Sequence, residues 1–252
     1  LPETVRNYYD LEPVNTALRE VHFPTGTEHL MEAKKRIIFD EFFRFFSALE
    51  LVKDREEQAL NHYIIPMEEP VKRFVENLPY PLTGAQKKVL NEIRQDFSDT
   101  MAMNRLLQGD VGSGKTIVAM TAMYAAVLAG YQAALMAPTE VLAEQHYQNF
   151  VKLLSPLGIT VALLTGSTKA KEKREIKAAC ASGEIQILIG THTVIQDDVA
   201  FDNLAFIVTD EQHRFGVKQR DAFMKKGKDP HVLVMSATPI PRTLALILYG
   251  DM

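Results

Sequence analysis

The sequence has almost no cysteine and no tryptophan. Its 252 residues include one cysteine, Cys180. A single cysteine excludes a disulfide within the chain and is typical of proteins from a reducing compartment. No pattern of metal ligands or catalytic partners surrounds Cys180, so we expect a packed side chain on a helix. The composition therefore indicates a cytoplasmic protein.

Long apolar runs and a secretory signal are also missing. The longest apolar run, IVAMTAMYAAVLA at residues 117–129, is too short to span a bilayer and predicts a buried helix. The first ten residues contain no basic segment followed by an apolar one, which excludes a signal peptide. The chain starts at Leu1 rather than methionine, so we expect it to be a piece of a longer protein. Nothing points to a membrane partner.

Positive charge is not in excess. The formal net charge is −4 and the isoelectric point is near 6.0, whereas proteins that coat nucleic acid non-specifically are usually basic. Any contact with DNA is therefore expected to use backbone amides and hydroxyls, or domains outside this chain. The basic run at 169–177 is interleaved with glutamates and predicts a solvated helix face. The lysines at 225–228 receive no role.

Two regions differ in their pattern. Residues 1–75 predict a helical connector, in which apolar residues recur at helical spacing over 30–52. A second stripe, at Phe39, Phe43 and Phe46, predicts a helix covered on two sides, or else the core helix of a small bundle. Residues 76–252 alternate short apolar runs with helical segments, which predicts an α/β domain with a mostly parallel sheet flanked by helices. The expected strands are 106–108, 133–137, 161–164, 187–190, 205–208 and 232–235, and the expected helices lie near 84–97, 115–129, 140–154 and 169–181.

Most of the expected strands end in glycines, hydroxyls or carboxylates. The carboxyl ends of parallel strands lie along one edge of a sheet, where open α/β proteins bind their ligands. The first of these ends is the most specific, because GDVGSGKT at 109–116 matches the phosphate-binding pattern G-x-x-x-x-G-K-[ST] between a strand and a helix. The alternative is a glycine-rich turn beside a surface lysine. The predicted nucleotide-binding residues of this loop are Gly109, Asp110, Val111, Gly112, Ser113, Gly114, Lys115 and Thr116.

Two adjacent carboxylates follow the strand expected at 205–208. A loop of this kind holds a triphosphate, with Lys115 at the phosphates and Thr116 at Mg²⁺. The metal then needs a carboxylate from a neighbouring strand, and we assign Asp210 to hold Mg²⁺ through water. Glu211 is assigned to activate the attacking water. The alternative is that both acids simply end a strand and pair with Lys218 or Arg220.

The sequence resembles the superfamily 2 helicases. The motifs that carry the resemblance occur in the order of that superfamily: GSGKT, APTEVLAEQH, TGS, GTHTVI, DEQH and SAT. The phrases DEQHRFGVKQR and SATPIPRT are similar to those of the RecG-type family, whose members are ATP-dependent DNA helicases that remodel stalled replication forks and branched DNA in recombination and repair. The resemblance implies a RecA-like P-loop domain over 76–252, which would be the first motor lobe. It also implies ATP and Mg²⁺ as cofactors and DNA as a partner.

The resemblance assigns further roles, position by position. It implies that Thr83 and Gln86 read adenine, although Thr83 is equally a helix cap. His213 would act in catalysis and would couple the ATP site to the DNA site. The same coupling role falls to Ser236, Ala237 and Thr238. The residues expected to contact the backbone of the tracked strand are Thr139, Glu140, Thr165, Gly166 and Thr191.

The chain departs from the family pattern in its extent. A second motor lobe with its arginine finger, and a DNA-gripping wedge domain that would precede Leu1, are both missing from it. We therefore expect the isolated chain to be nearly inactive. Two other interpretations of the chain stay open. It could be the motor lobe of a transcription–repair coupling type translocase, or a nucleotide- and DNA-binding module without activity of its own. An unrelated P-loop kinase is disfavoured, because it would need a second substrate pocket.

Overall fold

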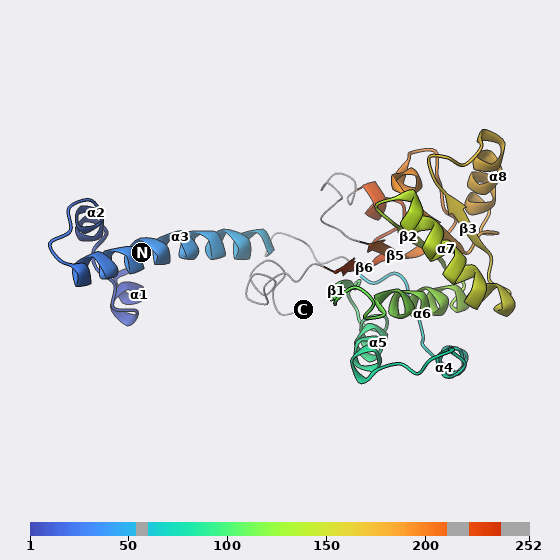
Figure 1. The fold of residues 1–252 in the computed structure, drawn as a ribbon, viewed down its shortest axis with the longest axis horizontal. Coiled ribbons are helices and arrows are strands. Elements are labelled where there is room, and N and C mark those ends of the chain that lie inside the picture. The colour runs from blue at the N-terminus through green and yellow to red at the C-terminus, as the bar shows by residue number, and fades with distance from the viewer. Residues whose placement is uncertain (54–59, 211–221, 238–252) are drawn as a thin grey trace. The chain divides into compact units, whose positions relative to one another are not determined.

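The structure, a computed structural model, describes residues 1–53, 60–210 and 222–237 (Figure 1). These residues form two compact units, one that ends at residue 53 and one that starts at residue 60. Residues 60–75 therefore belong to the second unit. The predicted division into a connector and a motor domain near residue 75 stays a prediction.

The first unit consists of three helices, α1 (Glu3–Tyr8), α2 (Val14–His22) and α3 (Thr27–Lys53). The helix expected over 30–52 is confirmed by α3. Helix α2 packs along α3, and Ala17 and Ala33 are fully buried. Phe39 contacts Tyr9, with ring centroids 5.0 Å apart. The expected second stripe is covered only in part, since Phe39 is half-buried whereas Phe43 and Phe46 each keep 38% of their surface accessible. Phe42 and Phe45, which lie outside that stripe, are exposed as well.

The second unit is built on a six-stranded sheet in the order β1-β6-β5-β2-β4-β3, and every pair of neighbours is parallel. Each expected strand overlaps an observed one, which confirms the α/β fold. The strands are β1 (Asn104–Gln108), β2 (Gln132–Met136), β3 (Val161–Leu164), β4 (Ile187–Gly190), β5 (Leu204–Asp210) and β6 (His231–Ser236).

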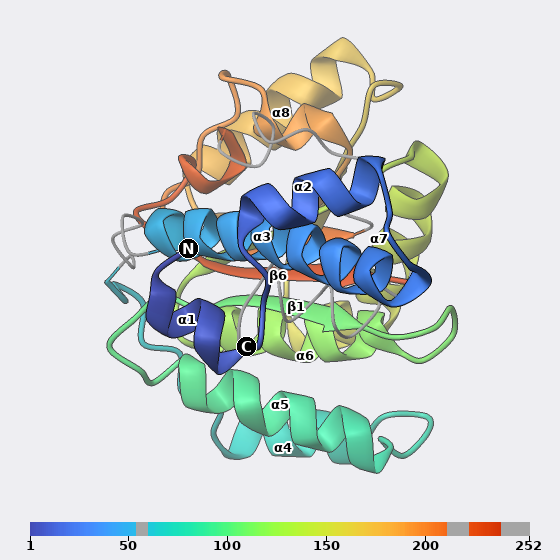
Figure 2. The ribbon, with the colours of Figure 1, turned by 90° about the vertical axis from the view of Figure 1, so that its left-hand side faces the viewer.

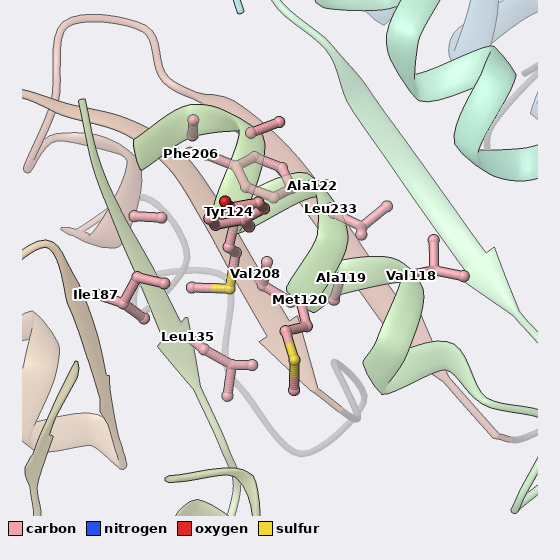
Figure 3. Close-up of a cluster of buried hydrophobic side chains, with 14 of the residues drawn as sticks. Val118, Ala119, Met120, Ala122, Tyr124, Leu135, Ile187, Phe206, Val208 and Leu233 are labelled. Atoms are coloured by element: carbon pink, nitrogen blue, oxygen red, sulfur yellow. The ribbon is translucent and has the colours of Figure 1, made fainter. Parts of the chain in front are cut away.

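Helices cover both faces of this sheet. Helix α6 (Lys115–Leu128) is buried from residue 117 to residue 127, and its side chains pack with those of β2, β4, β5 and β6 (Figure 3). Helices α4 (Glu69–Glu76) and α5 (Gly84–Asp96) pack against α6, which lies between them and the strands (Figure 2). Among the described residues, no helix combines the length and the apolar character that crossing a membrane requires. The helices of this unit are α4 (Glu69–Glu76), α5 (Gly84–Asp96), α6 (Lys115–Leu128), α7 (Glu140–Leu154), α8 (Ala170–Ala181) and the short 3₁₀ helices η1 (Ser155–Leu157) and η2 (His192–Ile195).

The position of Asp210 in strand β5 determines on which face of the sheet its carboxylate lies. All seven of its residues are buried. Phe206 and Val208 belong to the core cluster shared with α6 and α7, whereas Ile207 belongs to the cluster on the face of α8. Since side chains alternate along a strand, Asp210 lies on the same face as Val208. The carboxylate predicted to serve a metal therefore emerges on the side of α6 and α7.

Cys180 lies on α8 and is fully buried, as expected. Burial raises the pKa of its thiol to about 12. A thiol of this kind stays protonated at neutral pH and is inert as a nucleophile or metal ligand.

A buried histidine joins β6 to the segment that follows the first unit. His231 is fully buried, and its Nδ1 accepts a hydrogen bond of 2.9 Å from the Met103 amide. Its Nε2 therefore carries the proton, which it donates to the Tyr63 carbonyl at 2.8 Å. Burial lowers the pKa of His231 below its ordinary value of 6.5. The neutral ring is thus fully satisfied where it lies.

We predict that His231 makes stability depend on pH. Between the depressed folded pKa and 6.5, only the unfolded state takes up the proton, so the free energy of unfolding falls as the pH is lowered through this range. His231→Asn should remove this part of the slope, and should cost about 1–3 kcal/mol at pH 7.5 because the Tyr63 carbonyl loses its donor. Urea unfolding at a series of pH values measures both quantities. An unchanged slope in the variant would contradict the assignment.

Candidate functional site

The loop between β1 and α6 has the backbone of an anion cradle. Gly112 and Gly114 both have φ of 81°, in the left-handed region that favours glycine. A Cβ at Gly109 would lie 2.7 Å from the Ser113 hydroxyl oxygen, and a Cβ at Gly114 would collide with the side-chain amide of Gln86. No side chain caps α6 at Gly114. The backbone amides in the first turn of a helix point toward its N-terminus, where they can bind an anion.

The lysine of this loop lies over the cradle. Lys115 Nζ donates hydrogen bonds to the carbonyls of Gly109, at 2.6 Å, and Asp110, at 3.0 Å. Both acceptors are neutral, so an anion that enters the loop would attract the ammonium more strongly than they do. Thr116 follows directly in the first turn of α6, where it is partly buried.

Gln86 joins α5 to the same loop. Its backbone amide donates to Thr83 Oγ1 at 3.2 Å and its Oε1 accepts from the Thr83 amide at 2.8 Å, which forms a capping box at the start of α5. Its Nε2 donates to the Ser113 carbonyl at 2.9 Å. The helix-cap interpretation is therefore confirmed. Adenine recognition by this side chain stays a prediction, and these two side-chain contacts use one N–H and one lone pair of the amide.

The carboxylate that ends β5 has a partner that sequence reasoning missed. Asp210 Oδ2 lies 2.8 Å from His146 Nε2, and both side chains are buried. His146 belongs to a buried stripe of α7 that otherwise contains Ala143, Phe150 and Leu154. This helical spacing was a usable signal, because a polar residue in an apolar stripe needs a partner. Glu211 and His213 lie outside the described residues.

The end of β6 contacts the phosphate-binding loop. The amide of Gly109 donates a hydrogen bond of 3.2 Å to the carbonyl of Ser236. Residues 104–108 pair with residues 232–236 in register, so the first loop residue continues that ladder. Of the predicted coupling residues, Ser236 is thus in direct contact with the loop, Ala237 follows it, and Thr238 lies outside the described residues.

A second group of predicted residues gathers at the start of α7. Thr139 caps this helix, its Oγ1 accepting from the Leu142 amide at 3.3 Å. Glu140 Oε1 accepts a hydrogen bond of 3.1 Å from the Ser167 amide. Hydrogen bonds from the side chain and backbone of Ser167 lower the pKa of Glu140. Lys173 in turn donates to the Gly166 carbonyl at 2.8 Å. The start of α7 and the loop at 165–168 therefore form one connected surface.

Two of the predicted DNA contacts face inward. Thr165 and Thr191 are both buried. Thr165 Oγ1 lies 2.9 Å from Ser167 Oγ, and Thr191 Oγ1 lies 3.4 Å from Thr193 Oγ1. The structure brings these threonines to the same edge as Glu140, but their hydroxyls are engaged within the protein. Their predicted contacts to a DNA backbone stay predictions.

The basic runs lie largely in solvent. On α8, Lys171 and Glu175 are 3.8 Å apart and exposed, as a solvated face predicts. Lys226 Nζ donates to the carbonyls of Gln196, at 2.6 Å, and Val199, at 2.9 Å.

An open hollow of about 630 Å³ lies beside residues 225–228, and one of the residues that line it is Leu204, the first residue of β5. It is therefore at the sheet edge opposite to the phosphate-binding loop.

Comparisons with known proteins place this arrangement among helicases. The model of the DEAD/DEAH box helicase family matches residues 83–247. The whole chain is 51% identical to the ATP-dependent DNA helicase RecG of Synechocystis sp., of which it covers 30%, and 50% identical to RecG of Bacillus subtilis, of which it covers 37%. A solved structure of RecG bound to a three-way DNA junction matches the whole chain with a TM-score of 0.81 and 45% identity, over 34% of that protein. The chain thus spans about a third of the length of the curated relatives it matches.

We predict that Glu140 anchors the loop at 165–168. Glu140→Ala removes the acceptor of the Ser167 amide, so hydrogen exchange of that amide should become several-fold faster while the melting temperature stays close to that of the wild type. Glu144→Ala is the matched control, because Glu144 lies one turn further along α7 and its carboxylate accepts a hydrogen bond from Gln148 of the same helix. Equal exchange rates in the two variants would contradict the anchoring role.

Proposed function

Since the chain belongs to the DEAD/DEAH box helicase family, we propose that it is the ATP-binding motor lobe of a larger ATP-dependent DNA helicase that remodels branched DNA. The observation that carries this proposal is the phosphate cradle at 109–114, which lies on the same sheet edge as the carboxylate of Asp210 and the surface at the start of α7. A triphosphate site and a surface for a nucleic-acid strand are the two elements that a motor lobe must combine.

The residues at the cradle fit MgATP as substrate. The glycine backbone, the first turn of α6 and Lys115 would hold the phosphates. Within the described part of the chain, no group of three or more histidine, cysteine or acidic side chains could hold a metal ion. Mg²⁺ binds through one or two carboxylates together with substrate phosphates, and Asp210 at the end of β5 supplies one carboxylate. We assign the metal to Thr116 and Asp210, and the activation of water to Glu211.

The DNA strand would run along the start of α7 and the loop at 165–168. The exposed residues there are Thr139, Glu140 and Val141 at the start of α7 and Gly166 and Ser167 in the loop, rather than a dense set of lysines, which agrees with the net charge of −4. Hydroxyls such as those of Thr139 and Ser167 contact phosphates without reading sequence. The relative solved with a three-way junction supports branched DNA as the substrate.

Turnover would need the rest of the full-length protein. The relatives are about three times longer than this chain, and we assign to the remainder a second motor lobe with an arginine finger. Such an arginine contributes about 10³ to 10⁵ in rate, so the isolated chain should hydrolyse ATP very slowly. The relatives come from bacteria, so we place the activity in the bacterial cytoplasm, where the chromosome lies.

We predict that Lys115→Ala abolishes nucleotide binding in the full-length protein and leaves the fold intact. Its Nζ donates to two loop carbonyls, so its loss removes the cation from the phosphates without opening a core. Binding of a fluorescent ATP analogue and a melting curve measure the two effects. Lys152→Ala, an exposed lysine on α7, is the control. Retained affinity, or lost affinity with a large drop in melting temperature, would contradict the proposal.

We also predict that the two adjacent acids have separable roles. Glu211→Gln should leave ATP binding intact and slow hydrolysis by about 10²- to 10⁴-fold, which is the usual contribution of a general base. Asp210→Asn should instead weaken binding in a Mg²⁺-dependent way. Equilibrium binding and single-turnover hydrolysis distinguish the two. Identical behaviour of the variants would show that this division of roles is wrong.

A further inference from the structure

We propose that His146 is a positioning residue that orients the carboxylate of Asp210 for the metal and makes the metal site respond to DNA at the start of α7. This inference rests on the proposed function, because it takes Asp210 to serve the Mg²⁺ of MgATP. It concerns the last residue of the motif APTEVLAEQH, a residue to which the sequence analysis assigned no role.

The geometry fixes the carboxylate. An aspartate carboxylate rotates broadly about its last side-chain bond when nothing restrains it. Here His146 Nε2 lies 2.8 Å from Asp210 Oδ2, in a pair of which both members are buried. This hydrogen bond restricts rotation of the carboxylate. Partners of metal-ligating groups commonly act in this way, by setting the orientation of the ligand.

The imidazole is itself held by packing. His146 lies on the buried side of α7 together with Ala143, Phe150 and Leu154. Ala143, Phe150 and Leu154 belong to the main core cluster, which they share with α6 and β5. A ring in such surroundings cannot swing to another partner without leaving the core, so the position of Asp210 follows the position of α7.

The same helix begins at the proposed DNA surface. Its first turn carries Glu140, which bonds to Ser167 in the loop at 165–168. Glu140 and His146 are about 9 Å apart along the helix axis, at 1.5 Å per residue. A regular helix transmits a shift of its first turn to its second. DNA that seats against the first turn would therefore move or steady the ring that holds Asp210.

Coupling of this kind is reciprocal. If DNA tightens binding of the magnesium nucleotide by some factor, the nucleotide must tighten DNA binding by the same factor. A histidine that only satisfied a buried carboxylate would affect stability, but it would leave this factor unchanged. The factor is therefore the quantity that separates a positioning role from a structural one.

The test uses the full-length protein and three substitutions at one position. His146→Leu keeps apolar bulk and removes the donor. His146→Gln places an amide nitrogen near the original Nε2, and His146→Asn has an amide that is too short to reach it. Asn149→Leu, on an exposed side of α7, is the control. The measurement is the affinity for a fluorescent, non-hydrolysable ATP analogue across a Mg²⁺ titration, with and without a forked DNA.

We expect the Mg²⁺ concentration for half-maximal binding to rise about 10- to 100-fold in His146→Leu and His146→Asn. Forked DNA should lower that concentration about 5- to 150-fold in the wild type, and should have little effect in these two variants. His146→Gln should recover most of both properties, and Asn149→Leu should match the wild type. Melting curves establish that each variant is folded, and the Gln–Asn pair decides the question if the leucine variant is not.

The positioning role would be overturned if His146→Leu or His146→Asn is folded and keeps the wild-type Mg²⁺ dependence and DNA response. It would also be overturned if His146→Gln is as impaired as His146→Asn. The coupling would be overturned if DNA does not change the nucleotide affinity of the wild type. Lys115→Ala, measured alongside, separates this failure from a failure of the proposed function. If it binds the analogue normally, the nucleotide site itself is wrong. If it loses binding while His146→Leu behaves as the wild type, only the role of His146 fails.

Discussion

The common direction of six strands is the constraint on which the site depends. Parallel neighbours must be joined by crossovers, here helices, so each strand ends at the same edge of the sheet. Three contacts at or near that edge join segments far apart in the chain: Gly109 with Ser236, His146 with Asp210, and Glu140 with Ser167. An antiparallel connection at any one strand would send its loop to the opposite edge. The chemistry assigned to the motifs is therefore a consequence of strand direction before it is a property of any side chain.

What the sequence predicted well was local. The six strands and helices α5 to α8 follow from apolar spacing, whereas α4, η1 and η2 were not predicted. The loop at 109–114 follows from its glycines, two of which have the left-handed φ that the pattern implies. The pairs that build the site were not predicted. His146 and Asp210 are 64 residues apart, and no local pattern connects them. Burial of Thr165 and the exposed phenylalanines of α3 were also missed, because hydropathy does not say which side of an element is covered.

The phosphate cradle is held in shape by side chains of α5 and of the first turn of α6. Lys115 donates to two loop carbonyls, and Gln86 donates to a third. A bound triphosphate would have to exchange at least the lysine contacts for contacts to phosphate, so part of the gross binding energy is used in that exchange. The loop is thereby kept open and ordered before its ligand arrives. This preorganisation depends on α5, where the sequence predicted a helix cap and adenine recognition but not the contact of Gln86 with the loop.

The place of β1 in the sheet has a consequence for synthesis of the protein. β1 is an edge strand, and its single neighbour is β6, the last described strand of the chain. The strand that carries the cradle therefore cannot join the sheet until nearly the whole domain has left the ribosome. At about 5–20 residues per second, this interval lasts on the order of 10 s. During it, the nascent chain carries a complete phosphate-binding motif whose strand has not yet joined the sheet, so we expect no ATP binding before β6 pairs with β1.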